Sequence, residues 1–211
     1  MLIDHLAEQY AANHSTTLPS LLQEVYDYTI THHKEAHMIS GPLQGQLLTM
    51  ISKMQRPMHI LEIGTFTGFS ALCLAAGLQQ NGQLHTIEFR QDDADIAQSF
   101  FHRSIYKDQI ILHRGDAKTI IPQLQLEWDL IFIDADKTAY STYYKLLLPQ
   151  LSKQGVMLAD NTLFHGQVLG ENIKGKNAIA IDAFNKMVAA DPSTEQVMLT
   201  VRDGLMLIRK L

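Results

Sequence analysis

The chain has 211 residues, 46% of them hydrophobic and 18% charged, so it is long enough for one α/β domain with a sizeable core and is not of the disordered class. Its formal net charge of −5 excludes a global basic field that would attract nucleic acid. The one cysteine, Cys73, cannot form an intramolecular disulfide, and the apolar run around it predicts a buried side chain in a reducing compartment.

The first 55 residues carry helical patterns and no convincing strand. Apolar residues recur at helical spacing over 18–28 and 42–54, so we expect 1–55 to form an N-terminal helical cap. Residues 1–8 lack the basic start and apolar run of a signal peptide, and no stretch long and apolar enough for a membrane helix occurs. We therefore expect a cytoplasmic protein without a membrane span.

From residue 56 onward, short apolar segments alternate with helical ones. Strands are predicted at 58–63, 84–88, 110–113, 128–134, 155–160, 195–201 and 205–209, and helices at 69–78, 92–106, 139–148 and 177–189. The last two strands flank Asp203-Gly204, a hairpin signal. This order predicts an α/β fold with a doubly wound, mostly parallel seven-stranded sheet and a C-terminal antiparallel hairpin. The cap and this Rossmann-like core, 56–211, would form a single domain.

Acidic residues end four of the predicted strands: Glu62, Glu88, Asp134 and Asp160. Ligands of such sheets bind at the carboxyl ends of the strands. Because a buried unpaired charge is costly, the four acids indicate bound ligands. Helix capping and loop solvation would explain one such residue well, but they explain four poorly.

A glycine turn follows the first of these strands, with the sequence Glu-Ile-Gly-Thr-Phe-Thr-Gly-Phe-Ser over 62–70. The spacing of Gly64 and Gly68 does not match the G-x-G-x-x-G fingerprint of dinucleotide sites. The Glu62 carboxylate would repel a pyrophosphate but suits the ammonium of an amino-acid cofactor. Ser70 lies near the start of the next helix, where backbone N–H groups are free.

Two acids besides Glu62 have positions that suit a nucleoside. Glu88 ends the second strand, where an acid contacts the ribose diol in dinucleotide sites. Asp116 follows the third strand. At that position its carboxylate would accept a hydrogen bond from the amino group of an adenine.

Together and in this order, several stretches resemble the small metal-dependent class I O-methyltransferases, the family of catechol and caffeoyl-CoA O-methyltransferases. They are 62–70, Gly-Asp-Ala at 115–117, Phe-Ile-Asp-Ala-Asp-Lys at 132–137, Ala-Asp-Asn at 159–161 and Arg-Asp-Gly-Leu at 202–205. The match runs from about Met38 to the C-terminus, and the first 30 or so residues match poorly. The resemblance implies S-adenosylmethionine (SAM) as cofactor. It also implies a cofactor site lined by Met38, Ser40, Glu62, Gly64, Ser70, Glu88, Ala117 and Asp136, to which we add Asp116 and Asp134.

Asp134, Asp160 and Asn161 follow strands that should be neighbours. Two carboxylates and an amide oxygen form a hard oxygen site, which suits Mg²⁺, or Mn²⁺ or Ca²⁺, rather than zinc. The three protein ligands leave about half of an octahedron open, and the resemblance implies that two adjacent oxygens of a catechol fill two of these places and a water the third. The alternative is that Asp160-Asn161 only caps the following turn.

Lys137 stands three residues after Asp134, within reach of a substrate hydroxyl. A divalent cation lowers the pKa of such a hydroxyl and fixes its direction, and it makes a nearby lysine easier to deprotonate. The resemblance assigns the matching lysine as general base, so Lys137 and the ligand Asp134 are the expected catalytic residues. The alternative for Lys137 is a solvated lysine at the head of a helix.

The expected function is therefore methylation of one hydroxyl of a vicinal dihydroxy aromatic small molecule. Two alternatives stay open: methylation of 5-hydroxyuridine in tRNA, and a cofactor-binding module without catalysis. Oxidoreduction with NAD fails on the glycine spacing and on the missing Tyr-x-x-x-Lys. The family also implies a homodimer, with substrate choice set by the N-terminal helices and by the loop 163–175, which we expect to order on binding.

Three histidines and one tryptophan remain outside this scheme. His33 and His37 have the i, i+4 spacing of a zinc pair, but neither they nor His32 have an evident third ligand. A histidine near Met38 would instead touch substrate or cofactor. Trp128 begins a strand, which favours core packing over stacking on a ligand.

Overall fold

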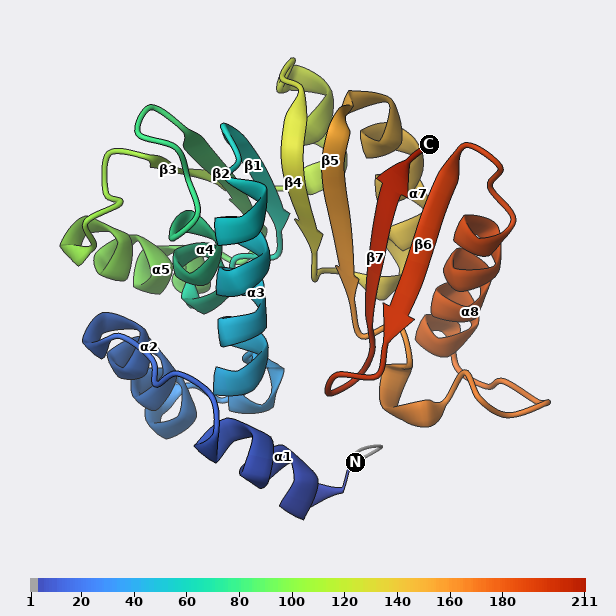
Figure 1. Ribbon diagram of the computed structural model, residues 1–211, viewed down its shortest axis with the longest axis horizontal. Helices are drawn as coiled ribbons and strands as arrows, with labels where there is room; N and C mark the ends of the chain where they lie inside the picture. The colour runs from blue at the N-terminus through green and yellow to red at the C-terminus, as the bar shows by residue number, and fades with distance from the viewer. Residues whose placement is uncertain (1–3) are drawn as a thin grey trace.

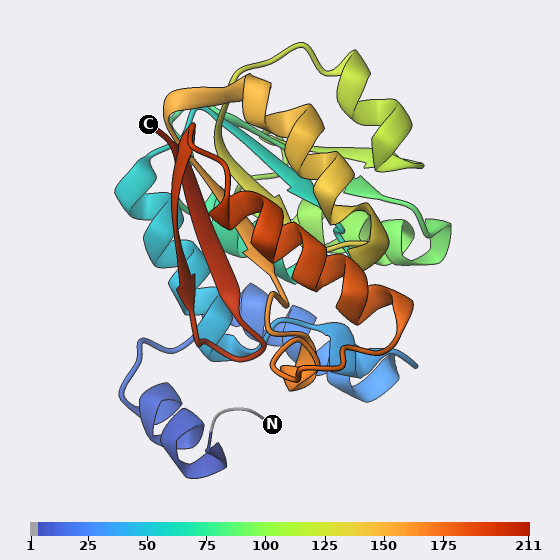
Figure 2. The same cartoon turned by 90° about the vertical axis from the view of Figure 1, so that its right-hand side faces the viewer.

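The computed structural model describes residues 4–211, which form a seven-stranded sheet covered by helices on both faces (Figures 1 and 2). The strands are β1 His59–Ile63, β2 Gln83–Glu88, β3 Ile110–Arg114, β4 Trp128–Ile133, β5 Leu151–Asp160, β6 Thr194–Leu199 and β7 Leu205–Lys210. The α-helices are α1 His5–Asn13, α2 Ser20–His32, α3 Pro42–Gln55, α4 Phe69–Ala75, α5 Gln91–Arg103, α6 Ala117–Ile120, α7 Tyr140–Leu147 and α8 Lys176–Ala189. Short 3₁₀ turns are η1 Ala36–Met38, η2 Ile121–Gln123, η3 Lys137–Ala139, η4 Leu148–Gln150 and η5 Phe164–Gly166.

The strand order is β3-β2-β1-β4-β5-β7-β6. Strands β1 to β5 pair in parallel, and β7 pairs antiparallel with both β5 and β6. This confirms the predicted doubly wound sheet with its C-terminal hairpin. The chain reverses its direction of winding between β1 and β4, so the ligand crevice of such a fold lies at the carboxyl ends of these two strands.

Two apolar cores lie on the two faces of the sheet. One side packs against α2 to α5 and the other against η2, α7 and α8, as the placement of α3 and α7 in Figures 1 and 2 also shows. Cys73 is buried in the first core, where burial raises the pKa of its thiol to about 12, so the expected buried cysteine is confirmed. Trp128 is fully buried in the second core, as expected for packing.

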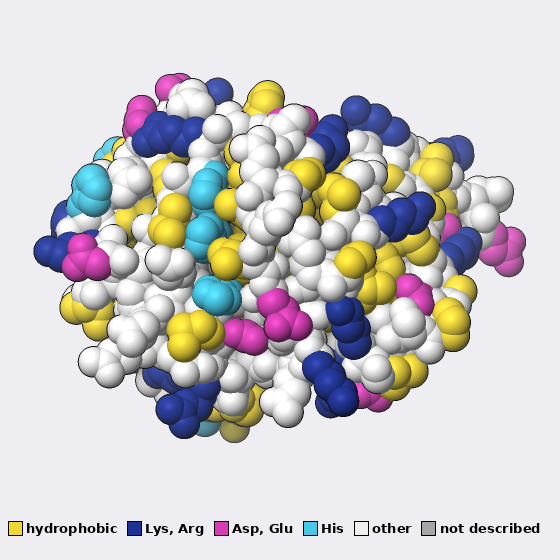
Figure 3. All heavy atoms as spheres, turned by 90° about the horizontal axis from the view of Figure 1, so that it is seen from above, with side chains coloured by type: hydrophobic (Ala, Val, Ile, Leu, Met, Phe, Trp, Pro, Cys, Tyr) yellow, Lys and Arg dark blue, Asp and Glu magenta, His cyan; other side chains and the backbone are white. Residues whose placement is uncertain are grey.

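Histidine side chains gather in a row on the end of the molecule seen in Figure 3. His59, His85 and His113 belong to the neighbouring strands β1, β2 and β3, and the rings of His59 and His85 meet Trp128 edge-on. His85 Nδ1 and His113 Nε2 are 2.9 Å apart. Burial, followed by the nearby His113 and His59, lowers the pKa of His85 to about 4, so His85 is neutral at physiological pH.

Several element boundaries differ from the sequence prediction. Strand β5 begins at Leu151 rather than 155, because Leu151 pairs with Trp128 across a bulge while the exposed polar residues 153–154 hide the strand pattern. Helix α4 ends at Ala75 rather than 78, since Gly77 packs directly on Ser52 of α3. Helices α1 and α6 were not predicted, because their short sequences carry little periodicity.

Within residues 4–211, no helix is long and apolar enough to cross a membrane. Residues 1–3, which are part of the segment used to argue against a signal peptide, lie outside the described residues.

Candidate active site

A cavity of about 1050 Å³ lies at the carboxyl ends of β1, β2, β4 and β5. Among the residues predicted for the site, those that line it are Met38, Ser40, Gly64, Ser70, Glu88, Asp116, Ala117, Asp134, Asp136, Lys137, Asp160 and Asn161. The lining also includes the loop after β5 and the β6–β7 turn. Residues predicted from separate motifs therefore meet in one place, with Glu62 as the exception.

The turn after β1 depends on Gly64 because its backbone has φ 96° and runs against β4. A Cβ at this position would stand 1.9 Å from the backbone oxygen of Asp134. Gly68, with φ 90°, then leads directly into α4. The turn thus passes close to the end of β4 and presents the start of α4, with Ser70, to the cavity.

Glu62 is fully buried beneath this turn and does not line the cavity. Thr86 Oγ1 donates a hydrogen bond to Glu62 Oε2, while Oε1 has no hydrogen-bond partner. Burial is the largest cause that raises the pKa of this carboxyl, to about 8; Asp134 and Glu88 add to the rise, and the hydroxyls of Ser70 and Thr86 oppose it. A buried carboxylate with an unpaired oxygen is expected to gain from a cationic partner.

The carboxylates of Glu88, Asp116 and Asp136, which are predicted to line the cofactor, accept hydrogen bonds from backbone N–H groups. Glu88 accepts from the N–H of Phe66 at 2.8 Å through Oε2 and from that of Arg90 at 2.9 Å through Oε1. Asp116 caps α6 through the N–H of Lys118, and Asp136 caps η3 in the same way. Helix capping therefore accounts for part of the role of Asp116 and Asp136, which are not among the four strand-end acids.

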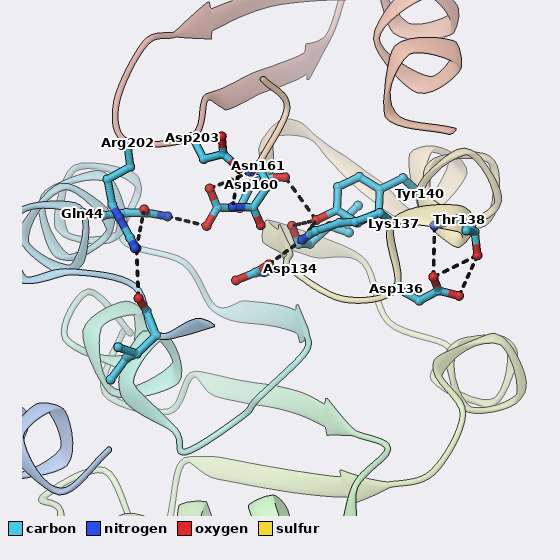
Figure 4. Close-up of polar contacts among 12 residues, drawn as sticks. Gln44, Asp134, Asp136, Lys137, Thr138, Tyr140, Asp160, Asn161, Arg202 and Asp203 are labelled. Carbon is cyan, nitrogen blue, oxygen red and sulfur yellow. Dashed lines mark hydrogen bonds and ion pairs between the residues drawn. The ribbon is translucent and has the colours of Figure 1, made fainter. Parts of the chain in front are cut away.

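Asp134, Asp160 and Asn161 converge at the ends of β4 and β5 (Figure 4). Each has a polar partner that orients it. Lys137 Nζ donates to Asp134 Oδ1 at 2.7 Å, Gln44 Nε2 to Asp160 Oδ2 at 2.6 Å, and Asn161 Nδ2 to Asp203 Oδ2 at 3.3 Å. The last contact leaves the Asn161 amide oxygen as the free end of that side chain.

These oxygens fit a hard divalent cation. Burial, followed by the neighbouring Asp134 carboxylate, raises the pKa of Asp160 to about 6, and a cation between the two would relieve both effects. Residues 4–211 contain no group of three His, Cys, Asp or Glu side chains placed to hold a metal. Beside the carboxylates of Asp134 and Asp160, the Asn161 amide oxygen is the side-chain oxygen at this end of the cavity that could serve as a third ligand.

Lys137 is largely buried and donates to the hydroxyl oxygen of Tyr140 at 2.8 Å as well as to Asp134 (Figure 4). Burial alone would lower the pKa of Lys137, but Asp134, Tyr140 and Asp160 together raise it above its ordinary value. Lys137 is therefore charged while Asp134 is its ion-pair partner, rather than the solvated lysine of the alternative reading.

The loop after β5 carries unusual backbone angles. Asn161, Phe164 and His165 all have φ between 43° and 56°, and Asp203 accepts hydrogen bonds from the backbone N–H of His165 as well as from Asn161. Strained residues of this kind concentrate at functional sites. Phe164 and His165 line the cavity, while the ordering of 163–175 on binding stays a prediction.

The three histidines near residue 35 have separate surroundings. His33 Nε2 lies 2.9 Å from Asp93 Oδ1, and its ring meets Phe66 of the cofactor turn edge-on. His32 Nδ1 contacts the Tyr28 carbonyl oxygen, and His37 is exposed at the cavity. His33 thus ties the segment before η1 to the glycine turn.

Sequence reasoning missed Gln44 and Tyr140 and gave no role to Arg202 and Asp203. Gln44 was hidden because it belongs to a helix with an apolar stripe, and only its polarity on a buried position would have marked it. Tyr140 stands three residues after Lys137, a spacing that places the two side chains together only once η3 is formed.

A family model described as O-methyltransferase matches residues 12–211. The chain belongs to this family. A catechol O-methyltransferase from Niastella koreensis is 35% identical over 164 residues, which are 75% of this chain and 74% of that protein. Caffeoyl-CoA O-methyltransferase 1 from Eucalyptus globulus is 30% identical over 205 residues, covering 92% of this chain and 82% of the relative.

Solved structures agree with these sequence relatives. An O-methyltransferase from Bacillus cereus in complex with SAH superposes with a TM-score of 0.90 at 29% identity, covering 98% of this chain and 97% of the other. An SAH-bound methyltransferase from Podospora anserina gives 0.92 at 28% identity, covering 100% and 98%. The chain is therefore a SAM-dependent O-methyltransferase of the catechol and caffeoyl-CoA type, as the sequence motifs predicted.

Proposed function

We propose that this O-methyltransferase methylates one hydroxyl of a vicinal dihydroxy aromatic small molecule and requires a divalent cation, Mg²⁺ in the first instance. The observation that carries the proposal is the convergence of Asp134, Asp160, Asn161 and Lys137 in the cavity beside the glycine turn. The name of the Niastella koreensis relative, a catechol O-methyltransferase, supports the same substrate class.

The cofactor is assigned to the β1–β2 side of the cavity. Ser70 and the backbone at Gly64 would hold its amino-acid end, with Glu62 supplying negative charge from behind the turn. Glu88 would accept from the ribose hydroxyls, and Asp116 and Ala117 would flank the adenine. Met38, Ser40, Asp134 and Asp136 complete the predicted lining.

The cation would be held by Asp134, Asp160 and Asn161, and when bound it lowers the pKa of the substrate hydroxyl and fixes its direction. Lys137 would lose its ion-pair partner once the Asp134 charge is compensated, so that its neutral amine accepts the hydroxyl proton. Tyr140 keeps the Lys137 amine in place. The substrate oxygen then bonds to the methyl carbon as the bond from that carbon to sulfur breaks, which leaves S-adenosylhomocysteine.

One incubation tests the proposal. Labelled SAM and Mg²⁺ are supplied with a catechol in one tube and with undermodified tRNA in another, each with and without a chelator. Label transfer to the catechol that the chelator abolishes is the expected result. Transfer of label to tRNA alone would contradict the proposed catechol-like substrate. Transfer that persists with the chelator would contradict the proposed requirement for a divalent cation.

We also propose a homodimer, following the family. Leu6 and Tyr10 of α1 are 73% and 67% exposed, which leaves apolar surface available for a second copy. Light scattering of the purified protein would give the mass directly.

A further inference from the structure

The cavity is lined by four lysine or arginine side chains that differ in their partners. Three of them form ion pairs. Arg90 Nε lies 2.6 Å from Asp93 Oδ2, Lys118 Nζ lies 3.7 Å from Asp116 Oδ2, and Lys137 Nζ lies 2.7 Å from Asp134 Oδ1. Arg202 has no carboxylate oxygen within ion-pair distance anywhere in residues 4–211. The cavity therefore contains one arginine whose charge the described chain leaves uncompensated.

The guanidinium of Arg202 is only partly used by the fold. Its Nη1 donates to the Ile39 carbonyl oxygen at 3.0 Å and, more weakly, to Gln44 Oε1 at 3.4 Å (Figure 4). A guanidinium has five N–H groups, and those on Nε and Nη2 have no acceptor among the described residues. Arg202 lines the cavity, so these unpaired donors belong to a side chain that a ligand in the cavity can approach.

The position holds Arg202 in a backbone conformation that most side chains avoid. Its φ of 48° lies in the left-handed region, where a residue other than glycine costs about 1 kcal/mol. The neighbouring Asp203 forms no ion pair with Arg202; its carboxylate instead accepts from Asn161 and from the backbone N–H of His165 and lies 3.6 Å from His165 Nδ1. Two neutral acceptors do not explain why an arginine stands here.

The place of Arg202 also points to the substrate side of the cavity. Gln44, whose Oε1 faces Arg202, donates from Nε2 to Asp160, so a single amide separates the guanidinium from a proposed cation ligand. A carboxylate is the group whose two oxygens match two parallel N–H donors of arginine.

We propose that Arg202 binds a carboxylate in the cavity and that this carboxylate is a substituent of the aromatic substrate. The preferred substrates are then dihydroxy aromatic acids rather than neutral catechols. The proposal rests on the proposed function for the aromatic diol. The other possible source of a carboxylate is the amino-acid end of the cofactor, which the experiment separates.

The test compares a catechol that carries a propanoate side chain with the same catechol carrying a propanamide. The wild type is expected to favour the acid in kcat/KM. Arg202→Gln should lower the acid-to-amide ratio by about 10- to 100-fold, the range for one charge-assisted hydrogen-bonded pair. Arg202→Lys, which keeps the charge without the fork, should give an intermediate ratio, and the matched control Arg209→Gln, at an exposed arginine paired with Glu195, should keep the wild-type ratio.

A wild-type ratio near one, or equal losses for acid and amide in Arg202→Gln, would overturn the proposal and leave Arg202 as a link to Ile39. Calorimetric titration with S-adenosylhomocysteine tests whether Arg202 instead binds the carboxylate of the cofactor. If Arg202→Gln binds S-adenosylhomocysteine more weakly while its acid-to-amide ratio of kcat/KM is unchanged, the carboxylate belongs to the cofactor and the substrate assignment is overturned. If the wild type methylates neither compound, the proposed function fails. Binding of the acid and the amide in the presence of S-adenosylhomocysteine and Mg²⁺ then decides the role of Arg202 by itself.

Discussion

Glu62→Gln removes the charge of the carboxyl buried beneath the cofactor turn while keeping its shape. The pKa of this carboxyl rises from 4.5 to about 8, chiefly through burial. The folded protein therefore keeps a proton that the unfolded chain releases, so its free energy of unfolding falls as the pH rises from 4.5 to 8. With about 1.4 kcal/mol for each pKa unit, the fall attributable to Glu62 is on the order of 5 kcal/mol without cofactor.

Urea unfolding of the cofactor-free protein across this pH range measures the effect. Wild type should lose stability relative to Glu62→Gln as the pH rises, because glutamine does not ionise. Above pH 8, where the Glu62 carboxyl is ionised even without cofactor, the same variant should bind SAM about 10- to 100-fold more weakly, since the cofactor ammonium loses a nearby negative charge. The exposed residue Glu127 provides the control, and Glu127→Gln should follow wild type in both measurements.

Unfolding curves of wild type and Glu62→Gln that change in parallel with pH would refute the burial argument. An unchanged SAM affinity in the variant would refute the proposal that the Glu62 charge stabilises the cofactor ammonium from behind the turn.

Three further predictions concern the rest of the site. Lys137→Ala should lower kcat by about 100- to 10,000-fold, the range for general acid–base catalysis, while the dissociation constant of SAM changes little; unchanged turnover at neutral pH would remove the base role. Mg²⁺ binding, followed by calorimetry, should weaken as the pH falls below about 6, because the cation must then displace the proton on Asp160; a flat profile would argue against Asp160 as a ligand. Gly64→Ala should destabilise the fold by about 3 kcal/mol or more, since its Cβ would meet the Asp134 backbone oxygen. Gly170→Ala, which has open space around it, is the control, and equal melting temperatures for the two variants would contradict the prediction.

The order of strands and helices could be predicted from the sequence because short apolar segments mark the strands and apolar residues at helical spacing mark the helices. The strand-end acids were readable for the same reason, since a residue that directly follows a buried strand is placed by that strand. Errors fell where the local signal is weak, at the polar start of β5 and in the short helices α1 and α6. The lining of the cavity by Asp134, Lys137, Asp160 and Asn161 follows from motif and topology together.

The sequence by itself determined which chemical groups end each strand and which cofactor class they suit, because both depend on short, local patterns. Only the tertiary structure decided which distant side chains meet them. Gln44 and Asp160 are 116 positions apart, and Arg202 and Ile39 are 163 apart, so no local pattern relates them. The tertiary structure also decided that Glu62 lies behind the cavity wall with a raised pKa, because desolvation depends on the packing of the whole turn against β2 and β4.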